Sequence, residues 1–304
     1  MTIEVFTAHR SLLVGVAYRI LGSAADAEDV VQEAWLRWAD VDATSVADPK
    51  AYLVRVTTNL AIDRLRRLRA RRQAYVGPWL PEPVVAAPDA ADPAERADSL
   101  ELALLVVLET LSPLERAVFV LREAFGFSHA EIAEFLGRGE PAVRQLARRA
   151  RDHVRERRPR FDVDRRERRT ITERFVAACE KGDVEALTAL LTADVRLVGD
   201  GGGKARAPLR ELAGAVPVAR FLLAIASPGG RRRFLASIGA PPGVEMDLEI
   251  ADVNGGPAIV ARLDGRPVTV VSLVVTAGLV GTVYLIANPE KMSRLGVSDA
   301  SASA

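Results

Sequence analysis

Residues 111–155 read LSPLERAVFVLREAFGFSHAEIAEFLGRGEPAVRQLARRARDHVR, and they predict two short helices followed by a longer one. Ser112 and Ser128 each stand three residues before a glutamate, the spacing of a capping box, in which the serine oxygen accepts a backbone N–H at the start of a helix. Gly137 and Gly139 then interrupt the chain. A short helix, a glycine turn and a second helix are typical of a helix-turn-helix.

The third predicted helix has two faces. Apolar residues at helical spacing form the stripe expected to be buried: Val143, Leu146, Ala147, Ala150 and Val154. Arginines recur at the same spacing on another face: Arg144, Arg148, Arg151 and Arg155, with Arg149 beside them. Guanidinium groups in a row suit the DNA major groove, where they contact phosphates and guanine edges. A solvated charged face would produce the same row, but here it coincides with the turn and the caps.

Composition leaves the class of partner open, but the distribution of charge does not. The 304 residues suggest about two domains, and the 41 basic and 40 acidic residues nearly cancel. Arginines cluster at 64–72 and 144–169, whereas acids gather at 26–33 and 89–101. Local basic patches matter more for nucleic acid than the overall balance.

Cysteine usage and apolar runs limit the compartment. Cys179 is the only cysteine, which excludes an intrachain disulfide and a cysteine metal site. The N-terminus carries an early acid and no long apolar run, so no signal peptide is expected. Residues 268–287 contain no charged residue, but they are rich in Val and Thr and contain Gly278 and Gly281. Two buried strands are therefore predicted rather than a membrane helix, and the expected location is cytoplasmic.

The first 72 residues predict three or four helices. The first covers 6–21, and Ser23 can cap the next, whose apolar stripe ends in Trp35 and Trp38. A loop at 40–47 precedes a long helix that starts at Asp48-Pro49 and runs to about Arg72.

Three strings in this part carry a resemblance. They are YRILG (18–22), ADAEDVVQEAWLRW (25–38) and DPKAYLVRVTTNLAIDRLR (48–66), and they resemble region 2 of the extracytoplasmic-function sigma factors of RNA polymerase. The helix-turn-helix at 111–155 resembles region 4 of the same family. The resemblance implies a promoter-specificity subunit that binds the polymerase core and promoter DNA, with no catalytic residue, no cofactor, no metal and no membrane partner.

Region 2 of the family docks an acidic helix on the clamp of the largest polymerase subunit. The resemblance places this role on Asp26, Glu28, Asp29, Gln32, Glu33, Trp35, Leu36 and Trp38. Carboxylates suit a basic partner surface, and exposed aromatic residues anchor interfaces. The alternative is that the two tryptophans are core, and we expect one to be largely buried and the other partly exposed.

The DNA-binding residues are assigned in the same way. The −10 element would be met by Asn59, Asp63, Arg64, Arg66 and Arg67, with the loop at 40–47 forming a pocket for an unstacked base. Asn59 and Asp63 could instead bond each other within the helix. The −35 element would be met by Pro141, Ala142, Arg144, Gln145, Arg148 and Arg149, with region 4 near the polymerase flap. Glu140 would face phosphate unfavourably unless it turns away.

Three further strings match the SigJ-like subgroup, whose members carry a C-terminal SnoaL-like domain. A Pro-rich linker contains WLPEP (79–83), DGGGK (200–204) follows a predicted strand, and NPEKM (288–292) has Met292 where the subgroup usually has Leu. The interdomain regulatory residues predicted from them are Trp79, Leu80, Pro81, Glu82, Pro83, Asp200, Gly201, Gly202, Gly203, Lys204, Asn288, Pro289 and Lys291. DGGGK lacks the spacing and the Ser or Thr of a phosphate-binding loop. It could be a flexible hairpin tip or a contact loop.

The C-terminal part predicts an α+β fold. A helix at 170–191 breaks at Gly182-Asp183, and helical patterns also cover 209–225 and 231–238. Strands are predicted at 193–198, 244–253, 257–263, 268–276 and 279–287, with Asn254-Gly255, Asp264-Gly265 and Ala277-Gly278 as turns. A curved antiparallel sheet over helices resembles the SnoaL-like cone. The predicted organisation is region 2 at 1–75, linker at 76–99, region 4 at 100–160, cone domain at 168–295 and a disordered tail at 296–304.

The cone domain is not expected to be an enzyme. The three histidines, His9, His129 and His153, all precede it, and the acids Asp194, Asp247 and Asp252 show no paired spacing. An unknown small ligand in the cone is left open as a partner. Arg231-Arg232-Arg233 could hold an anion, although a solvated helix start is the commoner role of such a run. The alternatives are a ligand-sensing DNA-binding regulator that acts without polymerase and a DNA-tethered isomerase or hydrolase.

Overall fold

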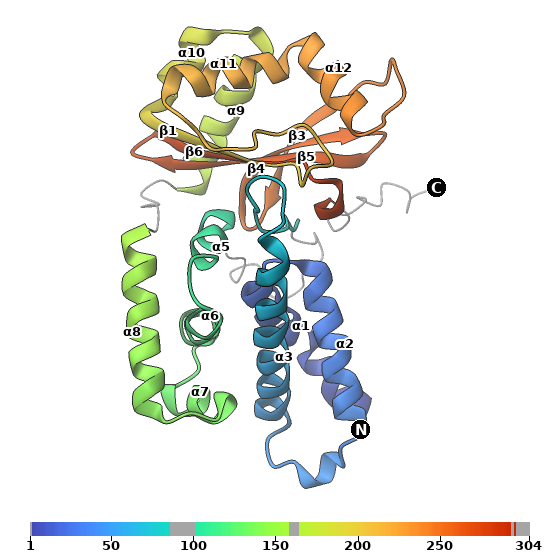
Figure 1. Cartoon of the computed structure of the whole chain (residues 1–304), viewed down its shortest axis with the longest axis vertical. Coiled ribbons are helices and arrows are strands. Elements are labelled where there is room, and N and C mark those ends of the chain that lie inside the picture. Colours follow the sequence, from blue (N-terminus) through green and yellow to red (C-terminus); the bar gives the residue numbers. More distant parts are fainter. Residues whose placement is uncertain (1, 86–100, 158–163, 293–294, 296–304) are drawn as a thin grey trace. The chain divides into compact units, whose positions relative to one another are not determined.

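The structure, a computed structural model, describes residues 2–85, 101–157, 164–292 and 295 (Figure 1). The chain forms two compact units: Met1–Gln73 with Leu104–Arg158, and Ala74–Ala103 with Pro159–Ala304. The first unit thus holds both predicted sigma regions, and the second holds the cone domain together with the described part of the linker. The predicted tail at 296–304 and much of the Pro-rich linker lie outside the described residues.

The N-terminal half of the first unit is helical, as predicted. It contains α1 (Thr2–Leu21), α2 (Ala24–Ala39), the short 3-10 turn η1 (Ala43–Ser45) and α3 (Pro49–Arg72). The Ser23 and Asp48 side chains accept backbone N–H groups at the starts of α2 and α3. Trp38 is fully buried beneath these helices, whereas Trp35 is half-buried. The expectation of one buried and one partly exposed tryptophan is confirmed.

The second half of the first unit contains the helix-turn-helix. Its elements are α5 (Leu102–Leu108), α6 (Pro113–Phe119), the π-helical η2 (Val120–Ala124), α7 (His129–Leu136) and α8 (Glu140–Arg157). Both capping boxes form, at Ser112 with Glu115 and at Ser128 with Glu131. Gly137 ends α7 in the left-handed conformation at φ 60°. Helix α5 was not predicted, because its uninterrupted apolar run LALLVVL has no helical period.

The second unit places helices on one side of a six-stranded sheet (Figure 1). The helices are α9 (Arg165–Lys181), α10 (Val184–Ala189), α11 (Ala215–Ala226) and α12 (Pro228–Ser237). The strands are β1 (Leu191–Asp200), β2 (Leu212–Ala213), β3 (Asp247–Val253), β4 (Gly256–Leu263), β5 (Arg266–Thr276) and β6 (Leu279–Ile286), and the 3-10 turn η3 (Pro289–Lys291) follows. The predicted break in the first helix falls at Gly182, which has a positive φ.

The strand order is β2-β1-β6-β5-β4-β3. Strands β3 to β6 form the predicted antiparallel meander, and Asn254, Asp264 and Ala277 each adopt φ near 50° before a glycine with positive φ. Such pairs suit the tight hairpin turns that match strand twist. The sheet differs from the prediction in two places. The two-residue strand β2 lies within the helix predicted at 209–225 and pairs with β1, and β1 runs parallel to β6. Helices and strands separate them in the chain, so no hairpin fixes their relative direction.

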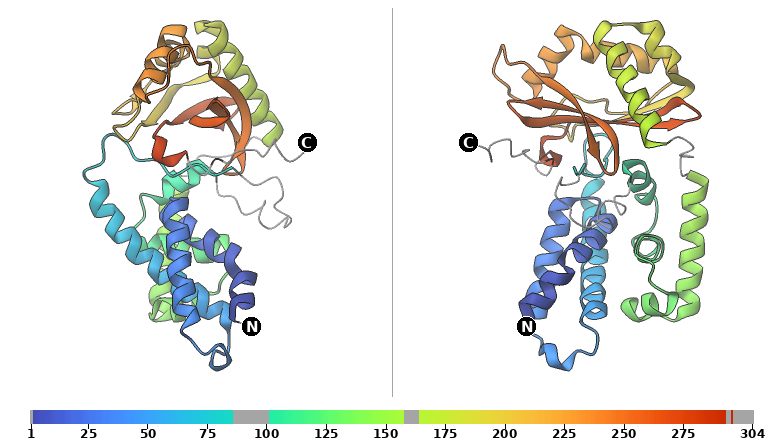
Figure 2. Two further views of the ribbon diagram at one scale, coloured as in Figure 1. Left: turned by 90° about the vertical axis from the view of Figure 1, so that its right-hand side faces the viewer. Right: turned by 180° about the vertical axis from the view of Figure 1, so that it is seen from behind.

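The sheet curls around the helices that cover it (Figure 2). The core between the two layers includes Phe175 of α9, Leu187 of α10, Leu222 of α11 and Val283 of β6. Residues 268–287 form most of β5 and β6, as predicted. Across the described parts of the chain, no helix combines the length and the apolar character needed to cross a bilayer.

Candidate functional site

The end of β1 holds a buried carboxylate that binds the linker. Asp200 is fully buried. Its Oδ1 accepts a hydrogen bond from the Tyr75 hydroxyl at 2.6 Å, and its Oδ2 accepts one from the Leu80 backbone N–H at 2.8 Å. The Lys291 ammonium pairs with the same Oδ2 at 2.6 Å. A buried carboxylate is stable only with such partners.

Lys291 is the second centre of this cluster. Its ammonium also donates to the Leu80 carbonyl and lies 4.0 Å from the centre of the Trp79 ring, a cation–π contact. The Asn288 amide donates to the Tyr75 hydroxyl at 2.8 Å. We call Tyr75, Trp79, Leu80, Asp200, Asn288 and Lys291 the linker clamp. Burial, then the hydrogen bond to Asp200, raises the pKa of Tyr75, so the phenol stays protonated as a donor.

The glycines after Asp200 allow the chain to approach the clamp closely. Gly202 has φ 58°, and a Cβ there would lie 2.4 Å from the Asn288 amide nitrogen. A Cβ on Gly201 would lie 2.2 Å from the Ala205 carbonyl oxygen. DGGGK is therefore a contact loop and not a flexible hairpin tip. The Lys204 side chain is exposed and pairs with Glu290 of η3, within the same unit.

Residues beyond the clamp extend the linker along the sheet. Val85 forms an antiparallel bridge with Val253 at the end of β3, the edge strand. The Asn254 backbone N–H donates to the Val84 carbonyl at 2.8 Å, and its side-chain oxygen accepts from Val84 N–H at 3.3 Å. The predicted Pro81, Glu82 and Pro83 between these contacts are buried. The linker thus satisfies backbone groups that an edge strand leaves open.

The far end of the linker meets the same unit at another point. The Arg168 guanidinium of α9 pairs with the Glu101 carboxylate at 2.7 Å, and both side chains are largely buried. The prediction missed Tyr75, Val84, Glu101, Arg168 and Asn254. Only Asn254 had a signal, and it was assigned to the hairpin turn alone.

The acidic helix α2 is partly occupied by contacts within its own unit. The Arg64 guanidinium bonds Asp26 at 2.7 Å and Asp29 at 3.0 Å, and Arg10 pairs with Glu28 at 2.5 Å. The Asp26 hydrogen bond is the main reason that the pKa of Arg64 is raised. These contacts hold a predicted −10 residue against predicted polymerase-binding residues.

Helix α2 also carries an exposed patch. Gln32 and Glu33 are exposed, and Leu36 is 64% exposed, which is unusual for a large apolar side chain. Trp35 lies beside them and packs on Phe6 with ring centres 5.0 Å apart. The assignment of Trp38 to a partner surface is wrong in this conformation, because its side chain has no accessible surface.

Helix α3 presents a basic, exposed face. Asn59, Asp63, Arg66 and Arg67 are exposed, and Asp63 pairs with Arg66 at 2.8 Å. The Asn59 amide donates to the carbonyls of Arg55 and Phe135, each at 3.0 Å. The alternative pairing of Asn59 with Asp63 is therefore not formed. Phe135 belongs to α7, so the predicted −10 and −35 halves meet at Asn59.

Arginines also join the two halves of the first unit. Arg69 donates to the carbonyls of Glu109 and Leu111, and Arg72 bonds the Glu109 carboxylate at 2.5 Å. The fully buried Arg116 bonds the same carboxylate and donates to the Arg19 carbonyl at 2.9 Å. We call these contacts of Arg69, Arg72 and Arg116 with Glu109 and Leu111 the Glu109 seam. It fixes the C-terminal end of α3 against α6.

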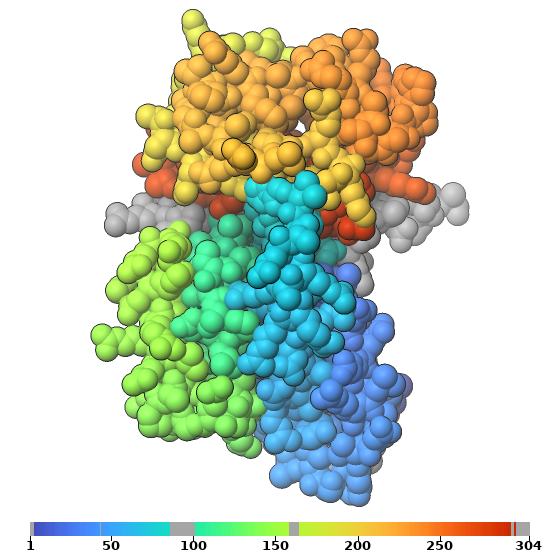
Figure 3. Space-filling view, viewed as in Figure 1, coloured from blue at the N-terminus to red at the C-terminus, as the bar shows by residue number. Residues whose placement is uncertain are grey.

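Helix α8 leaves all six predicted −35 residues exposed: Pro141, Ala142, Arg144, Gln145, Arg148 and Arg149. Figure 3 shows α8 and α3 at the surface on the face drawn. Glu140 turns toward Arg144 and bonds its guanidinium at 2.6 Å. Arg149 lies 3.2 Å from Glu115 of the first capping box. Both pairs are solvent-exposed on the arginine side, where ion pairs are weak and can exchange for phosphate.

A cavity of about 510 Å³ lies between the sheet and its helices in the cone domain and is open to solvent on one side. Apolar side chains dominate its lining, with Arg206, Arg231 and Arg233 as cations and Glu180 as an exposed acid. Asp194, Asp247 and Asp252 do not line it. Among the described residues no group of three His, Cys, Asp or Glu could hold a metal ion. The lining thus carries one carboxylate, that of Glu180, one thiol, that of Cys179, and no histidine.

Comparisons with known proteins agree with this arrangement. Residues 5–71 match the family model for Sigma-70 region 2, and residues 101–154 match that for Sigma-70 region 4. The chain is 39% identical to the ECF RNA polymerase sigma factor SigJ of Mycobacterium tuberculosis, over 96% of this chain and 94% of the relative. It is 30% identical to the probable sigma factor SigI of that organism, over 95% and 93%. The crystal structure of M. tuberculosis SigJ matches with a TM-score of 0.74 and 38% identity, covering 97% of this chain and 99% of that one.

Proposed function

The chain belongs to the extracytoplasmic-function sigma factors of RNA polymerase, in the SigJ-like group, and from this premise we propose that its C-terminal unit controls the sigma regions in cis. A sigma factor directs bacterial RNA polymerase to promoters and begins transcription, so it acts by binding and not as an enzyme. Its partners are the polymerase core and promoter DNA. The cytoplasm, where the polymerase works, is the compartment that this role requires.

In the first unit the two sigma regions are bonded to each other, and we call this arrangement the closed state. Asn59, assigned to the −10 element, is bonded to the backbone of α7, and the Glu109 seam ties the end of α3 to α6. A sigma factor that reads the −10 and −35 elements together needs α3 and α8 free to separate. Opening therefore has to break the Asn59 contact and the seam.

The single observation that carries the proposal is the linker clamp. Region 2 ends with α3 at Arg72, and the clamp takes hold at Tyr75. Region 4 begins with α5 at Leu102, and Arg168 holds the residue before it, Glu101. The C-terminal unit thus grips the linker next to both sigma regions. Holding both ends limits how far the regions can separate.

Chain geometry sets the size of this restraint. A released linker over residues 74–101 could span at most about 90 Å at roughly 3.3 Å per residue. With residues 75–85 held, only 86–100 can extend, which gives at most about 50 Å by the same measure. Holding Glu101 as well removes most of that freedom. The clamp therefore favours the closed state by limiting the alternatives to it.

Region 2 is proposed to bind the polymerase clamp through the exposed patch of α2, which combines Leu36 with Gln32 and Glu33. Asp26, Glu28 and Asp29 would join it once Arg10 and Arg64 exchange partners. The freed Arg64, with Arg66 and Arg67, would then face the −10 strand, and the loop at 40–47 would receive an unstacked base. Helix α8 would read the −35 element beside the flap.

Promoter-dependent transcription with purified core polymerase tests the cis control. The template is a promoter selected with the wild-type holoenzyme, and the compared proteins are the full chain, Asp200→Asn and Lys204→Ala. Asp200→Asn removes the charge that holds Lys291, and we expect more transcripts at equal sigma concentration. Lys204→Ala changes an exposed pair in the same loop and should match the wild type. Equal or lower output from Asp200→Asn would contradict a restraining clamp.

A further inference from the structure

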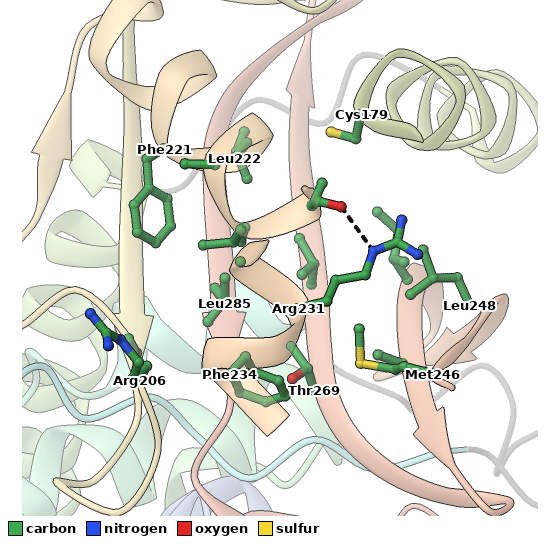
Figure 4. A pocket seen from close by; sticks show the side chains of 18 of the residues that line it. Cys179, Arg206, Phe221, Leu222, Arg231, Phe234, Met246, Leu248, Thr269 and Leu285 are labelled. Carbon is green, nitrogen blue, oxygen red and sulfur yellow. Dashed lines mark hydrogen bonds between the residues drawn. The ribbon is translucent and has the colours of Figure 1, made fainter. Parts of the chain in front are cut away.

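The cavity of the cone has the composition of a binding site for a small acid. It lies between the sheet and helices α9, α11 and α12 (Figure 4). Its volume of about 510 Å³ falls within the range of sites that hold small organic molecules. Phe221, Phe234 and Met246 line it and are only partly buried, and Leu248 is 37% exposed. Apolar side chains that converge on a space without being covered are a binding feature rather than a core feature.

Arg231 is the half-buried charge of this lining, whereas Arg206, Arg233 and Glu180 are exposed. Its Nε donates to the Ala226 carbonyl at 2.8 Å, which holds the side chain in place. In Figure 4 the guanidinium lies beside Leu248, and Arg206 lies on the other side of the cavity with Leu285 between them in this view. Among the described residues no carboxylate forms an ion pair with Arg231, Arg206 or Arg233. A half-buried guanidinium against apolar walls is stabilised by an anion that enters with the ligand.

We propose that the cone binds a monoanionic carboxylic acid with an apolar body, and that Arg231 pairs with its carboxylate. The planar guanidinium, with Nε already used, presents its two terminal nitrogens for a carboxylate. A phosphorylated ligand such as a nucleotide fits less well, because Thr269 is the only hydroxyl in the lining and Arg206 and Arg233 are exposed. The apolar body fills the space bounded by Phe221, Leu222 and Ile259.

This site is distinct from the linker clamp, since none of the clamp residues lines the cavity. The proposal therefore stands whether or not the clamp controls the sigma regions. The loop that begins at Asp200 reaches both places, because Arg206, Ala207 and Pro208 line the cavity while Leu209 lies next to Gly77 of the linker, 3.5 Å from where a Cβ on that glycine would be. Ligand binding in the cavity would thus act on the linker through this loop and regulate the cis control.

Direct binding to the full chain tests the proposal. Isothermal titration would use octanoate and 4-phenylbutyrate, with 1-octanol and 4-phenylbutanol as uncharged partners of the same length. We expect saturable one-to-one binding of at least one acid, about tenfold or more tighter than its alcohol, since a charge-assisted pair contributes on this scale. No saturable binding of either acid, or equal affinity for acid and alcohol, would overturn the proposal.

Variants then assign the charge to Arg231. Arg231→Gln should weaken acid binding about tenfold and leave alcohol binding within about twofold. Arg232→Gln is the matched control, because Arg232 is exposed, adjacent and outside the lining. Thr269→Phe should weaken both probes by filling the cavity, which keeps the test informative if Arg231→Gln folds poorly. Equal effects of Arg231→Gln and Arg232→Gln on the acid would refute the assignment.

Discussion

The Lys291 ammonium lies 2.6 Å from the Asp200 carboxylate, and both are almost fully buried. The two residues lie 91 positions apart in the sequence, at the end of β1 and in η3, and they hold the Leu80 backbone between them through its N–H and its carbonyl. A buried pair of this kind couples the fold of the cone to the position of the linker.

Breaking this pair should cost stability. Asp200→Asn leaves the Lys291 charge without its partner, and removing one member of a buried pair typically costs about 3–5 kcal/mol. Lys291→Met should cost a similar amount, and the double variant should cost less than the sum, because neither charge is then left alone. Urea unfolding of the full chain, followed by far-UV circular dichroism, measures all three. Additive losses would show that the two residues do not interact.

Gly202 should tolerate alanine poorly for a steric reason. Gly202→Ala adds a Cβ that would meet Asn288, whereas Gly239→Ala adds one at a similar positive φ with nothing within 4 Å. Both variants carry backbone strain of about 1 kcal/mol, so the excess loss in Gly202→Ala reports the clamp contact. That variant should also speed limited proteolysis within residues 75–85. Equal losses and equal cleavage would contradict the packing of the glycine loop.

The Glu109 seam predicts a local effect in the first unit. Glu109→Gln removes the charge shared by Arg72 and Arg116, of which Arg116 is fully buried. We expect faster amide hydrogen exchange at the C-terminal end of α3 and around α6, since partners of a lost buried charge are destabilised. Glu33→Gln, which disturbs the exposed pair with Arg37, serves as the control. Unchanged exchange in Glu109→Gln would show that the seam does not join the two halves.

The capping boxes predict a pH dependence. The pKa of Glu131 is lowered, first by its hydrogen bond to the Ser128 side chain and then by the Ser128 backbone N–H. A lowered folded-state pKa gives stability that is present above the unfolded value of about 4.3 and is lost as pH falls through the folded value. Glu131→Gln should therefore be less stable than the wild type at pH 7. The difference in their free energies of unfolding should shrink as pH falls from about 5 to about 3. A difference in stability between Glu131→Gln and the wild type that does not change with pH would contradict this account.

Cys179 should react slowly despite being the sole thiol. Burial raises the pKa of its thiol to about 12, which leaves little thiolate at pH 8. Iodoacetamide should label the folded protein far more slowly than the urea-unfolded protein. Since Cys179 lines the cavity, a bound carboxylic acid should slow labelling further. Labelling as fast as in the unfolded chain would mean that the thiol is open to solvent.

Local signals in the sequence predicted the elements well. Ser23, Asp48, Ser112 and Ser128 cap helices where expected, because a cap depends on residues within one turn. The three hairpin turns are also where their glycines indicated. The parallel pairing of β1 with β6 was missed, since it depends on how distant segments meet.

The candidate functional site was predicted only in part, because several of its contacts join residues that are far apart in the sequence. The three strings indicated that Trp79, Asp200 and Lys291 belong together, but nothing local marked Tyr75 as the donor to Asp200 or Asn254 as the partner of Val84. Trp38 was placed on a partner surface because helical spacing alone does not decide which of two tryptophans faces the core. Arg64 was assigned to DNA, whereas its carboxylate partners on α2 became visible only in three dimensions.

A distance measurement tests the central claim, that the linker clamp keeps the sigma regions closed. Spin labels would be attached to cysteines introduced at the exposed Ala70 of α3 and Ala142 of α8, in a Cys179→Ser background. The distance between the two labels, measured by pulsed electron paramagnetic resonance, reports the separation of the two halves. We predict one narrow distribution for the otherwise wild-type chain and for Lys204→Ala, and a longer, broader one for Asp200→Asn. An unchanged distribution in Asp200→Asn, with proteolysis showing residues 75–85 released, would contradict the claim.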